Sequence, residues 1–152
     1  RIGTCGSNNR DVKILDVLLA DSAYTLSTFP ELFDGTKDHS FDASENINNV
    51  LKSVANDLNI PFKEGKILTS DVFDVYTNID HVFGGCEFKD ELLTCEMEGF
   101  GLMHVARVET KEAGLLMTVS DSKFTPDVII SPEDRQTKLN DMIRLALESI
   151  IK

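Results

Sequence analysis

The sequence is poor in the residues that mark metal proteins, disulfide-rich proteins and membrane proteins. Its 152 residues include three cysteines, three histidines and no tryptophan. The cysteines lack the spacing of a metal site or a disulfide framework, and the histidines are scattered. No apolar run approaches the roughly 20 residues of a membrane span, and no charged-then-apolar secretion signal opens the sequence. We therefore expect reduced thiols, no metal, no membrane partner and a soluble, cytoplasmic location.

Positive charge is also scarce. Lys and Arg number 15 against 26 Asp and Glu, which gives a formal net charge of −11. Nucleic acids and anionic membranes bind basic surfaces, so neither is expected as the main partner. The acidic residues are spread along the chain, as is typical of a solvated surface.

The composition is ordinary for a globular protein, with 41% hydrophobic and 27% charged residues. A chain of this length can bury roughly 70% of its unfolded surface in one core. Its hydrophobic pattern predicts alternating strands and helices, the mark of the α/β class. Strands are predicted at 12–20, 62–69 and 114–119. Helices are predicted at 88–93, from about 99 to Glu109, from Ser131 onward, and from a cap at Ser44 or Asp42 to Asn59. We read residues 1–7 as a strand end with a glycine loop, 21–44 as a long surface loop, and 84–85 as a flexible point.

Two glutamates mark the predicted strand-to-helix corner at 94–101. Glu96 and Glu98 bracket Met97 just before the apolar helix face that starts at Phe100. Such corners lie at the sheet edge where α/β proteins bind small ligands. An ionised Glu can accept two hydrogen bonds from a vicinal diol such as that of ribose, and Glu98 has no other evident partner in the sequence. The alternative is an acidic helix N-terminus favoured by the helix dipole.

Three further groups could carry chemistry. Asp121 follows an apolar strand, where partial shielding from water favours the protonated form of a general acid. Arg135 is predicted in the first turn of the last helix, against the local dipole, which hints at a pairing with Asp121. Arg1 and Thr4 beside Gly3 could hold an oxyanion. The alternatives are an aspartate capping a turn, a surface arginine and a structural glycine turn.

Five ordered motifs resemble those of the hexameric, bacterial-type purine nucleoside phosphorylases. They are Arg-Ile-Gly-Thr-Cys-Gly at 1–6, Ser-Asp-Val-Phe at 70–73, Cys-Glu-Met-Glu-Gly at 95–99, Thr-Val-Ser-Asp at 118–121 and Asp-Arg-Gln-Thr-Lys-Leu-Asn-Asp-Met at 134–142. The resemblance covers essentially the whole chain. It implies a three-layer α/β/α fold with a mixed central sheet, formed by residues 1–152 as one nucleoside phosphorylase domain. It also implies a homohexamer built from dimers and an N-terminal segment ahead of Arg1. The segment agrees with the prediction that the sequence opens on the last residues of a strand.

The same resemblance implies reversible phosphorolysis of purine nucleosides in purine salvage, with phosphate as co-substrate and no cofactor. Asp121 matches the general acid toward purine N7, and Arg135 the residue that assists it. The phosphate-binding residues are Arg1, Gly3 and Thr4. The nucleoside-binding residues are Cys5, Gly6, Phe73, Cys95, Glu96, Met97, Glu98 and Ser120. Within that set, Phe73 matches the ring that packs on the purine, Met97 lies under the sugar, and Glu98 binds the ribose hydroxyls.

Departures from the family pattern leave alternatives open. Cys95 replaces a small aliphatic residue, residues 122–124 differ from the run that usually follows the Asp, and the stretch between Phe73 and Cys95 matches the family poorly. The sequence therefore does not decide between 6-oxo and 6-amino purines as substrates. The family's other phosphate-site Gly and Arg residues, and those lent by a neighbouring subunit, lie in the absent N-terminal segment. Uridine phosphorylase shares the Met-Glu pair, but its Gln-x-Arg element is not found in the 70–90 region. Methylthioadenosine and adenosylhomocysteine nucleosidases also have a Met-Glu and a Ser-Asp arrangement, but they use water instead of phosphate. Arg1 and the Asp-Arg-Gln-Thr run at 134–137 favour the phosphorylase. A non-catalytic nucleoside-binding module is the remaining alternative.

Overall fold

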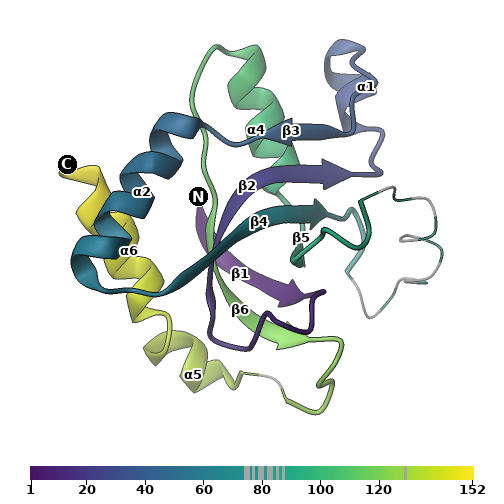
Figure 1. The fold of residues 1–152 in the computed structure, drawn as a ribbon. Helices are drawn as coiled ribbons and strands as arrows, with labels where there is room; N and C mark the ends of the chain where they lie inside the picture. The colour runs from purple at the N-terminus through teal and green to yellow at the C-terminus, as the bar shows by residue number, and fades with distance from the viewer. Residues whose placement is uncertain are drawn as a thin grey trace.

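A mixed sheet forms the centre of the computed structural model, which describes residues 1–73, 76, 78, 81, 84, 86, 88–128 and 130–152 (Figure 1). Its strands are β1 (Ile2–Ser7), β2 (Val17–Thr25), β3 (Ser40–Asp42), β4 (Phe62–Thr69), β5 (Thr94–Glu96) and β6 (Leu116–Ser122). Their order is β3-β2-β4-β5-β1-β6, and β6 also pairs with β2, so five strands close a ring of pairings. The pairs β1–β6, β2–β4 and β4–β5 are parallel, whereas β1–β5, β2–β3 and β2–β6 are antiparallel.

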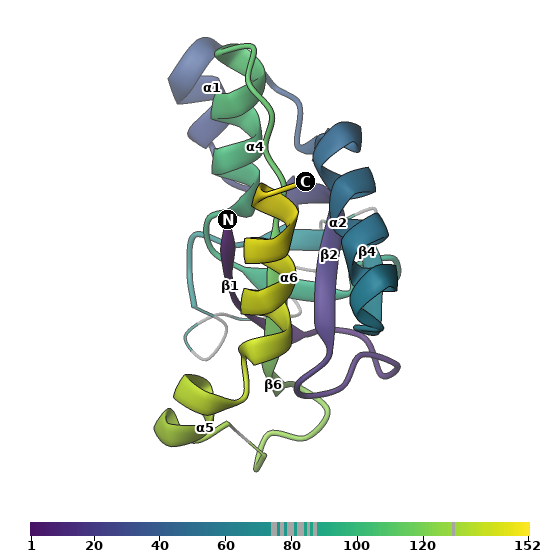
Figure 2. The same ribbon diagram turned by 90° about the vertical axis from the view of Figure 1, so that its left-hand side faces the viewer.

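Helices cover both faces of this sheet (Figures 1 and 2). They are α1 (Phe29–Asp34), α2 (Glu45–Leu58), α4 (Gly99–Val108), α5 (Pro132–Thr137) and α6 (Asn140–Ile150). Successive strand residues point to opposite faces, and the two faces bury separate cores. Leu18 and Met117 join the core that includes Phe100 and Met103 of α4. Leu19 and Leu116 join the core under α2 and α6. The α/β class with a mixed central sheet is confirmed.

Local signals placed several elements well. β4 has the predicted bounds, and the corner at 94–101 is indeed a strand followed by a helix. α2 begins where the Ser44 hydroxyl accepts a hydrogen bond from the Ile47 amide at 3.3 Å and ends at Asn59, whose φ is 53°. A hydroxyl cap at the start and a left-handed residue at the end are the helix signals that the sequence contains. Within the described residues, no helix is long and apolar enough to span a membrane.

The first quarter of the chain differs from the prediction. Residues 1–7 are not a strand end and loop, because β1 runs through them and lies between β5 and β6. The predicted strand at 12–20 was misplaced: Leu15 has a φ of 73°, and the Lys13 amide bonds to the Asp16 side chain, so a turn precedes β2. The predicted loop at 21–44 was wrong, since it contains the end of β2, all of α1 and β3.

Three later predictions also need correction. β6 continues to Ser122 because β1 pairs with it up to Ser7, so Ser120 and Asp121 lie inside the strand. The last helix is two helices: α5 has no buried residue, whereas α6 turns Met142 and Leu145 into a core, so the chain changes direction between them. The predicted helix at 88–93 is only a turn at 88–91. Of the flexible point at 84–85, residue 85 lies outside the described residues.

Candidate functional site

One cavity of about 390 Å³ runs along β1, between the end of β5 and the second half of β6. Its volume is in the range of small-ligand sites. Every site residue implied by the family resemblance lines it: Arg1, Gly3, Thr4, Cys5, Gly6, Phe73, Cys95, Glu96, Met97, Glu98, Ser120, Asp121 and Arg135. The fold therefore brings together residues that lie up to 134 positions apart, although their individual roles remain predictions.

Glu96 is the anchor of this cavity, and it is only 5% exposed. Its carboxylate accepts hydrogen bonds from the Glu98 amide at 2.9 Å and from the Gly99 amide, which lies 2.9 and 2.8 Å from its two oxygens. The Thr69 hydroxyl donates a further hydrogen bond. These donors include the first amide of α4, where a negative charge is also favoured by the helix dipole. Glu96 therefore caps α4.

Glu98 is placed quite differently. It precedes α4 but makes no side-chain capping bond, and its side chain is 59% exposed. The sequence left two roles open for these glutamates, and each residue takes one. Glu96 is the acidic residue of the helix N-terminus, whereas Glu98 extends into the cavity, where its carboxylate can accept hydrogen bonds from a ligand.

Arg1 lies between the two glutamates. Its Nη1 is 3.4 Å from Glu96 Oε2, and its Nη2 donates a hydrogen bond to Glu98 Oε2. The expectation that Glu98 has no partner except a sugar diol is therefore wrong. The Arg1 side chain folds over Gly3, where an added Cβ would lie 3.1 Å from Nη1. Close approach at Gly3 was expected of a loop glycine, and here it occurs within a strand.

Ser120 and Asp121 form a hydrogen-bonded pair on β6. The Ser120 hydroxyl donates to Asp121 Oδ2 at 2.7 Å and lies 3.4 Å from the carbonyl oxygen of Cys5. Arg135 lines the same cavity as Asp121, but among the described residues the two form no ion pair, so the predicted pairing is not observed. The dipole argument for Arg135 also fails, because α5 has only six residues and Arg135 lies in its last turn.

The cysteines of the cavity are apolar lining. Burial raises the pKa of the Cys5 thiol to about 12, and the negative charges of Asp121 and Glu96 act in the same direction. The thiol therefore stays protonated at neutral pH, and only a thiolate is a strong nucleophile. Covalent catalysis by Cys5 is not supported. All three cysteines are buried.

Residues 1–152 match the family model described as the Phosphorylase superfamily. The chain belongs to the phosphorylase superfamily. It is 37% identical over 153 residues to a protein of Psychromonas ingrahamii named purine nucleoside phosphorylase DeoD-type, covering 99% of this chain and 62% of that protein. It is 33% identical over 152 residues to one of the same name from Aliivibrio salmonicida, covering 100% and 63%. The chain thus spans less than two thirds of these relatives.

Solved structures agree on the superfamily fold. A structure of the P. knowlesi homologue of P. falciparum PNP superposes with a TM-score of 0.79 at 24% identity, covering 98% of this chain and 59% of that one. Purine nucleoside phosphorylase from Toxoplasma gondii, in complex with immucillin-H, gives a TM-score of 0.83 at 18% identity, covering 98% and 60%.

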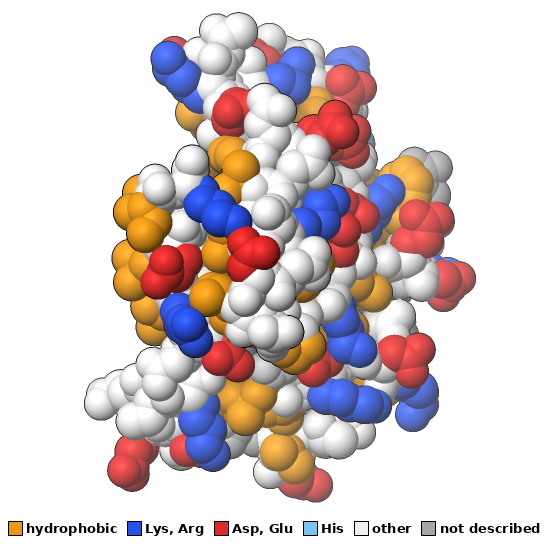
Figure 3. All heavy atoms as spheres, turned by 60° about the vertical axis from the view of Figure 1, so that its left-hand side comes forward, with side chains coloured by type: hydrophobic (Ala, Val, Ile, Leu, Met, Phe, Trp, Pro, Cys, Tyr) orange, Lys and Arg blue, Asp and Glu red, His pale blue; other side chains and the backbone are white. Residues whose placement is uncertain are grey.

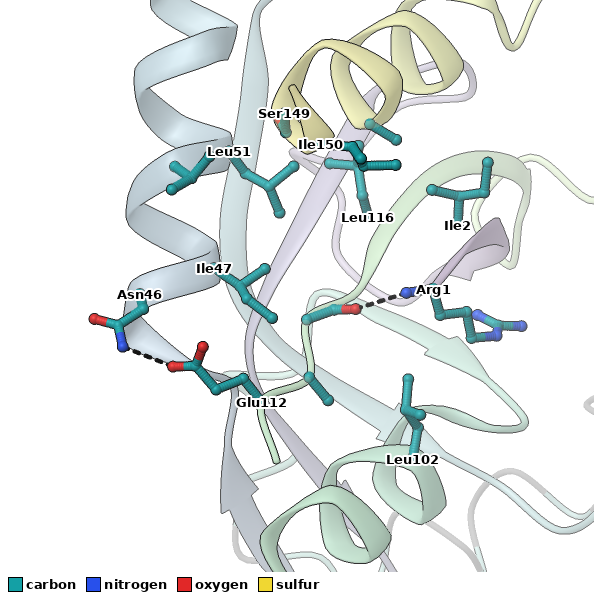
Figure 4. A pocket seen from close by; sticks show the side chains of 14 residues that line it. Arg1, Ile2, Asn46, Ile47, Leu51, Leu102, Glu112, Leu116, Ser149 and Ile150 are labelled. Carbon is teal, nitrogen blue, oxygen red and sulfur yellow. Dashed lines mark hydrogen bonds between the residues drawn. The ribbon is translucent and has the colours of Figure 1, made fainter. Parts of the chain in front are cut away.

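A second, larger cavity of about 530 Å³ lies between α2, α6 and the start of β1 (Figure 4). Ile47, Leu51 and Leu116 face it, and its polar groups are already paired. Asn46 donates to Glu112 at 2.6 Å, and the Arg1 backbone nitrogen donates to the Gly114 carbonyl at 2.9 Å. Apolar side chains also reach the surface on this side of the molecule, among mixed charges (Figure 3). Since polar groups do not converge there, the cavity along β1 is the stronger candidate for a site in this superfamily member.

Two residues that support the site were missed from the sequence, Thr69 and Gly99. Thr69 ends β4, and nothing in its local pattern points to a carboxylate 27 positions away. Gly99 opens α4, where a Cβ would lie 2.4 Å from Leu115 Cδ2 and 2.8 Å from Glu96 Oε1. A glycine at the first position of an apolar helix was the available signal for such a close approach.

Gly99→Ala tests this packing, with Gly101→Ala as its matched control. The added methyl at residue 99 would displace both a core leucine and the capping carboxylate, so we expect the free energy of unfolding to fall by about 1–3 kcal/mol. An added Cβ at residue 101 of the same helix would lie 4.0 Å from Phe29 Cε1, its nearest neighbour outside the helix backbone and the adjacent residues. There the loss of glycine should stabilise the helix by about 0.5–1 kcal/mol. Urea denaturation of both variants checks this; similar changes in the two would contradict it.

Proposed function

We propose that the complete protein is a purine nucleoside phosphorylase, which cleaves purine ribo- and deoxyribonucleosides reversibly to the free base and (deoxy)ribose 1-phosphate in purine salvage. Inorganic phosphate is the co-substrate, and no cofactor takes part. The observation that carries the proposal is the convergence of Arg1, Glu98 and Asp121 on one cavity. Relatives named purine nucleoside phosphorylase support it, as they match the chain over nearly its whole length.

The nucleoside would bind by its sugar and its base. Glu98 accepts the hydrogen bonds of the ribose 2′- and 3′-hydroxyls through its exposed carboxylate. Phe73 and Met97 are 51% and 44% exposed and line the same cavity, so apolar surface is available to a purine ring and the sugar. Burial of this surface against a flat ring favours binding. Cys95 and Cys5 complete the apolar lining.

The reaction needs a proton for the leaving base. A phosphate oxygen forms a bond to C1′ while the bond from C1′ to N9 breaks, and the electron pair passes into the purine, which takes a proton at N7. Asp121 supplies that proton in our proposal. The Ser120 hydroxyl occupies Oδ2 and orients the carboxyl, which leaves Oδ1 for the purine. Arg135 then stabilises the aspartate that remains.

The phosphate site would be completed by groups beyond Arg1, Gly3 and Thr4. Two arginines (Arg1, Arg135) and three carboxylates (Glu96, Glu98, Asp121) line the cavity, a formal balance of −1 when all are ionised. A cavity with this net negative charge binds phosphate poorly, and Arg1 is already paired with Glu96 and Glu98. We infer that further cations come from an N-terminal segment and from a neighbouring subunit of a homohexamer built from dimers. The exposed apolar residues support self-association. The three cysteines lack the spacing of a disulfide framework, which supports a cytoplasmic location.

The same charge balance favours one second candidate. In a hydrolase of the methylthioadenosine/adenosylhomocysteine nucleosidase type, water attacks C1′. Water is neutral, so its binding needs no cluster of positive side chains. Under that alternative Glu98 and Asp121 keep their roles, and Arg1 serves only to position Glu98.

Cleavage of inosine and adenosine with and without phosphate separates these functions. We expect the complete protein to release hypoxanthine or adenine only when phosphate is present, with ribose 1-phosphate as the other product. Equal release of base without phosphate, with free ribose as the product, would establish the hydrolase. Binding of nucleoside with no cleavage under either condition would mean a non-catalytic module.

Asp121→Asn tests the general acid. The variant keeps the shape of the side chain but has no proton to transfer, so kcat for inosine should fall about 10²-fold or more while substrate binding changes little. A nucleoside whose base already carries a positive charge at N7 does not need the proton and serves as the control. The variant should cleave it nearly as fast as wild type does. Equal losses on both substrates would make Asp121 a binding or structural residue.

A further inference from the structure

Thr69 connects three elements at the back of the candidate site. It ends β4 and is 6% exposed. Its hydroxyl donates to Glu96 Oε1 and accepts a hydrogen bond from the Phe100 amide at 2.8 Å. Its own carbonyl accepts a hydrogen bond from the Thr25 hydroxyl at 2.8 Å. The Thr69 hydroxyl is therefore held in a single orientation by a buried donor on one side and a buried acceptor on the other.

Glu96 also forms an ion pair with Arg1. Of the two carboxylates beside this guanidinium, the Glu98 side chain is 59% exposed, whereas that of Glu96 is 1% exposed. An exposed side chain retains rotamer freedom and a screened charge, so it fixes a partner poorly. The orientation of Arg1 is then set mainly by Glu96, and the orientation of Glu96 is set by its donors.

We propose that Thr69, which lies outside the residues that line the cavity, is a positioning residue of the site: through Glu96 it fixes the guanidinium of Arg1. The kinetic consequence rests on the proposed function, in which Arg1 contacts phosphate. Without the hydroxyl, Glu96 loses its side-chain donor at Oε1 and the Phe100 amide loses its acceptor, so the carboxylate is held only by the Glu98 and Gly99 amides. The buried carboxylate beside Arg1 is then less rigidly fixed, and so is the guanidinium that it orients.

Thr69→Val and Thr69→Ser test the proposal in the complete protein. Valine keeps the volume and removes the hydroxyl, whereas serine keeps the hydroxyl. We expect Thr69→Val to raise the KM for phosphate about tenfold, as for the loss of one hydrogen bond to a charged group, with kcat reduced less than threefold. Thr69→Ser should restore the KM to within about twofold of wild type.

Thr118→Val is the matched control. Thr118 is 1% exposed on β6, and its hydroxyl has no hydrogen-bond partner among the described residues. The same chemical change there should leave the KM for phosphate unaltered. If Thr69→Val lowers the melting temperature but leaves the KM for phosphate at the wild-type value, Thr69 is only structural and the inference is overturned.

A readout independent of activity follows the Arg1 guanidinium itself. Its rotation about the Cζ–Nε bond, measured by NMR, should be faster in Thr69→Val than in wild type, and unchanged in Thr118→Val. Equal rates in all three proteins would overturn the positioning role. If wild type needs no phosphate for cleavage, the proposed function fails, and the rotation of Arg1 alone decides whether Thr69 positions it.

Discussion

The geometry of the site depends on one buried carboxylate. Glu96 lies where β5 ends and α4 begins, and it accepts hydrogen bonds from the backbone of both Glu98 and Gly99 and from the Thr69 hydroxyl on β4. A buried charge is tolerated only when it is paired and hydrogen-bonded. These donors therefore restrain the β4 end, the β5 end and the first turn of α4 together. Gly99 is part of the same constraint, because a larger residue would occupy the space of the carboxylate.

Because Glu96 is fixed in this way, the side chain of Glu98 is available to a ligand. Because Glu96 satisfies the start of α4, Glu98 is not needed as a cap, and its carboxylate extends into the cavity beside Arg1. Met97, between them, is 44% exposed on the cavity wall. Three consecutive residues thus have three environments: a buried anchor, an exposed apolar surface and an exposed acceptor. In the proposed function, the exposed apolar surface packs on the nucleoside and the exposed acceptor binds the sugar diol.

The sequence predicted the elements whose signals are local. The Ser44 cap and Asn59 end define α2, and the apolar run of β4 has the observed bounds. The second half of β1 was predicted as a loop because its small and polar residues lack an apolar run. It is a strand because it pairs with β5 and β6, about 90 and 115 positions away. The break between α5 and α6 depends on which residues meet the core, which periodicity alone does not show.

Contacts between distant residues also limited the prediction of the site. Its residue set came from the resemblance, and the fold places that set around one cavity. The division between Glu96 and Glu98 could not be predicted, because both are acids beside one helix start. It is decided by Thr69 and Arg1, which lie 27 and 95 positions from Glu96. The sequence likewise did not show that Arg135 and Asp121, both on the cavity wall, form no ion pair among the described residues.

The most direct test compares Glu96→Gln with Glu98→Gln in two measurements, the free energy of unfolding and the affinity for a purine nucleoside. Glutamine at 96 presents an amide to the donors of α4, so stability should fall by about 1.5–3 kcal/mol. Glutamine at 98 should leave stability nearly unchanged and weaken nucleoside binding about tenfold or more, with binding of the free base little affected. The account is contradicted if Glu98→Gln is the destabilising change, or if it binds nucleoside as tightly as wild type.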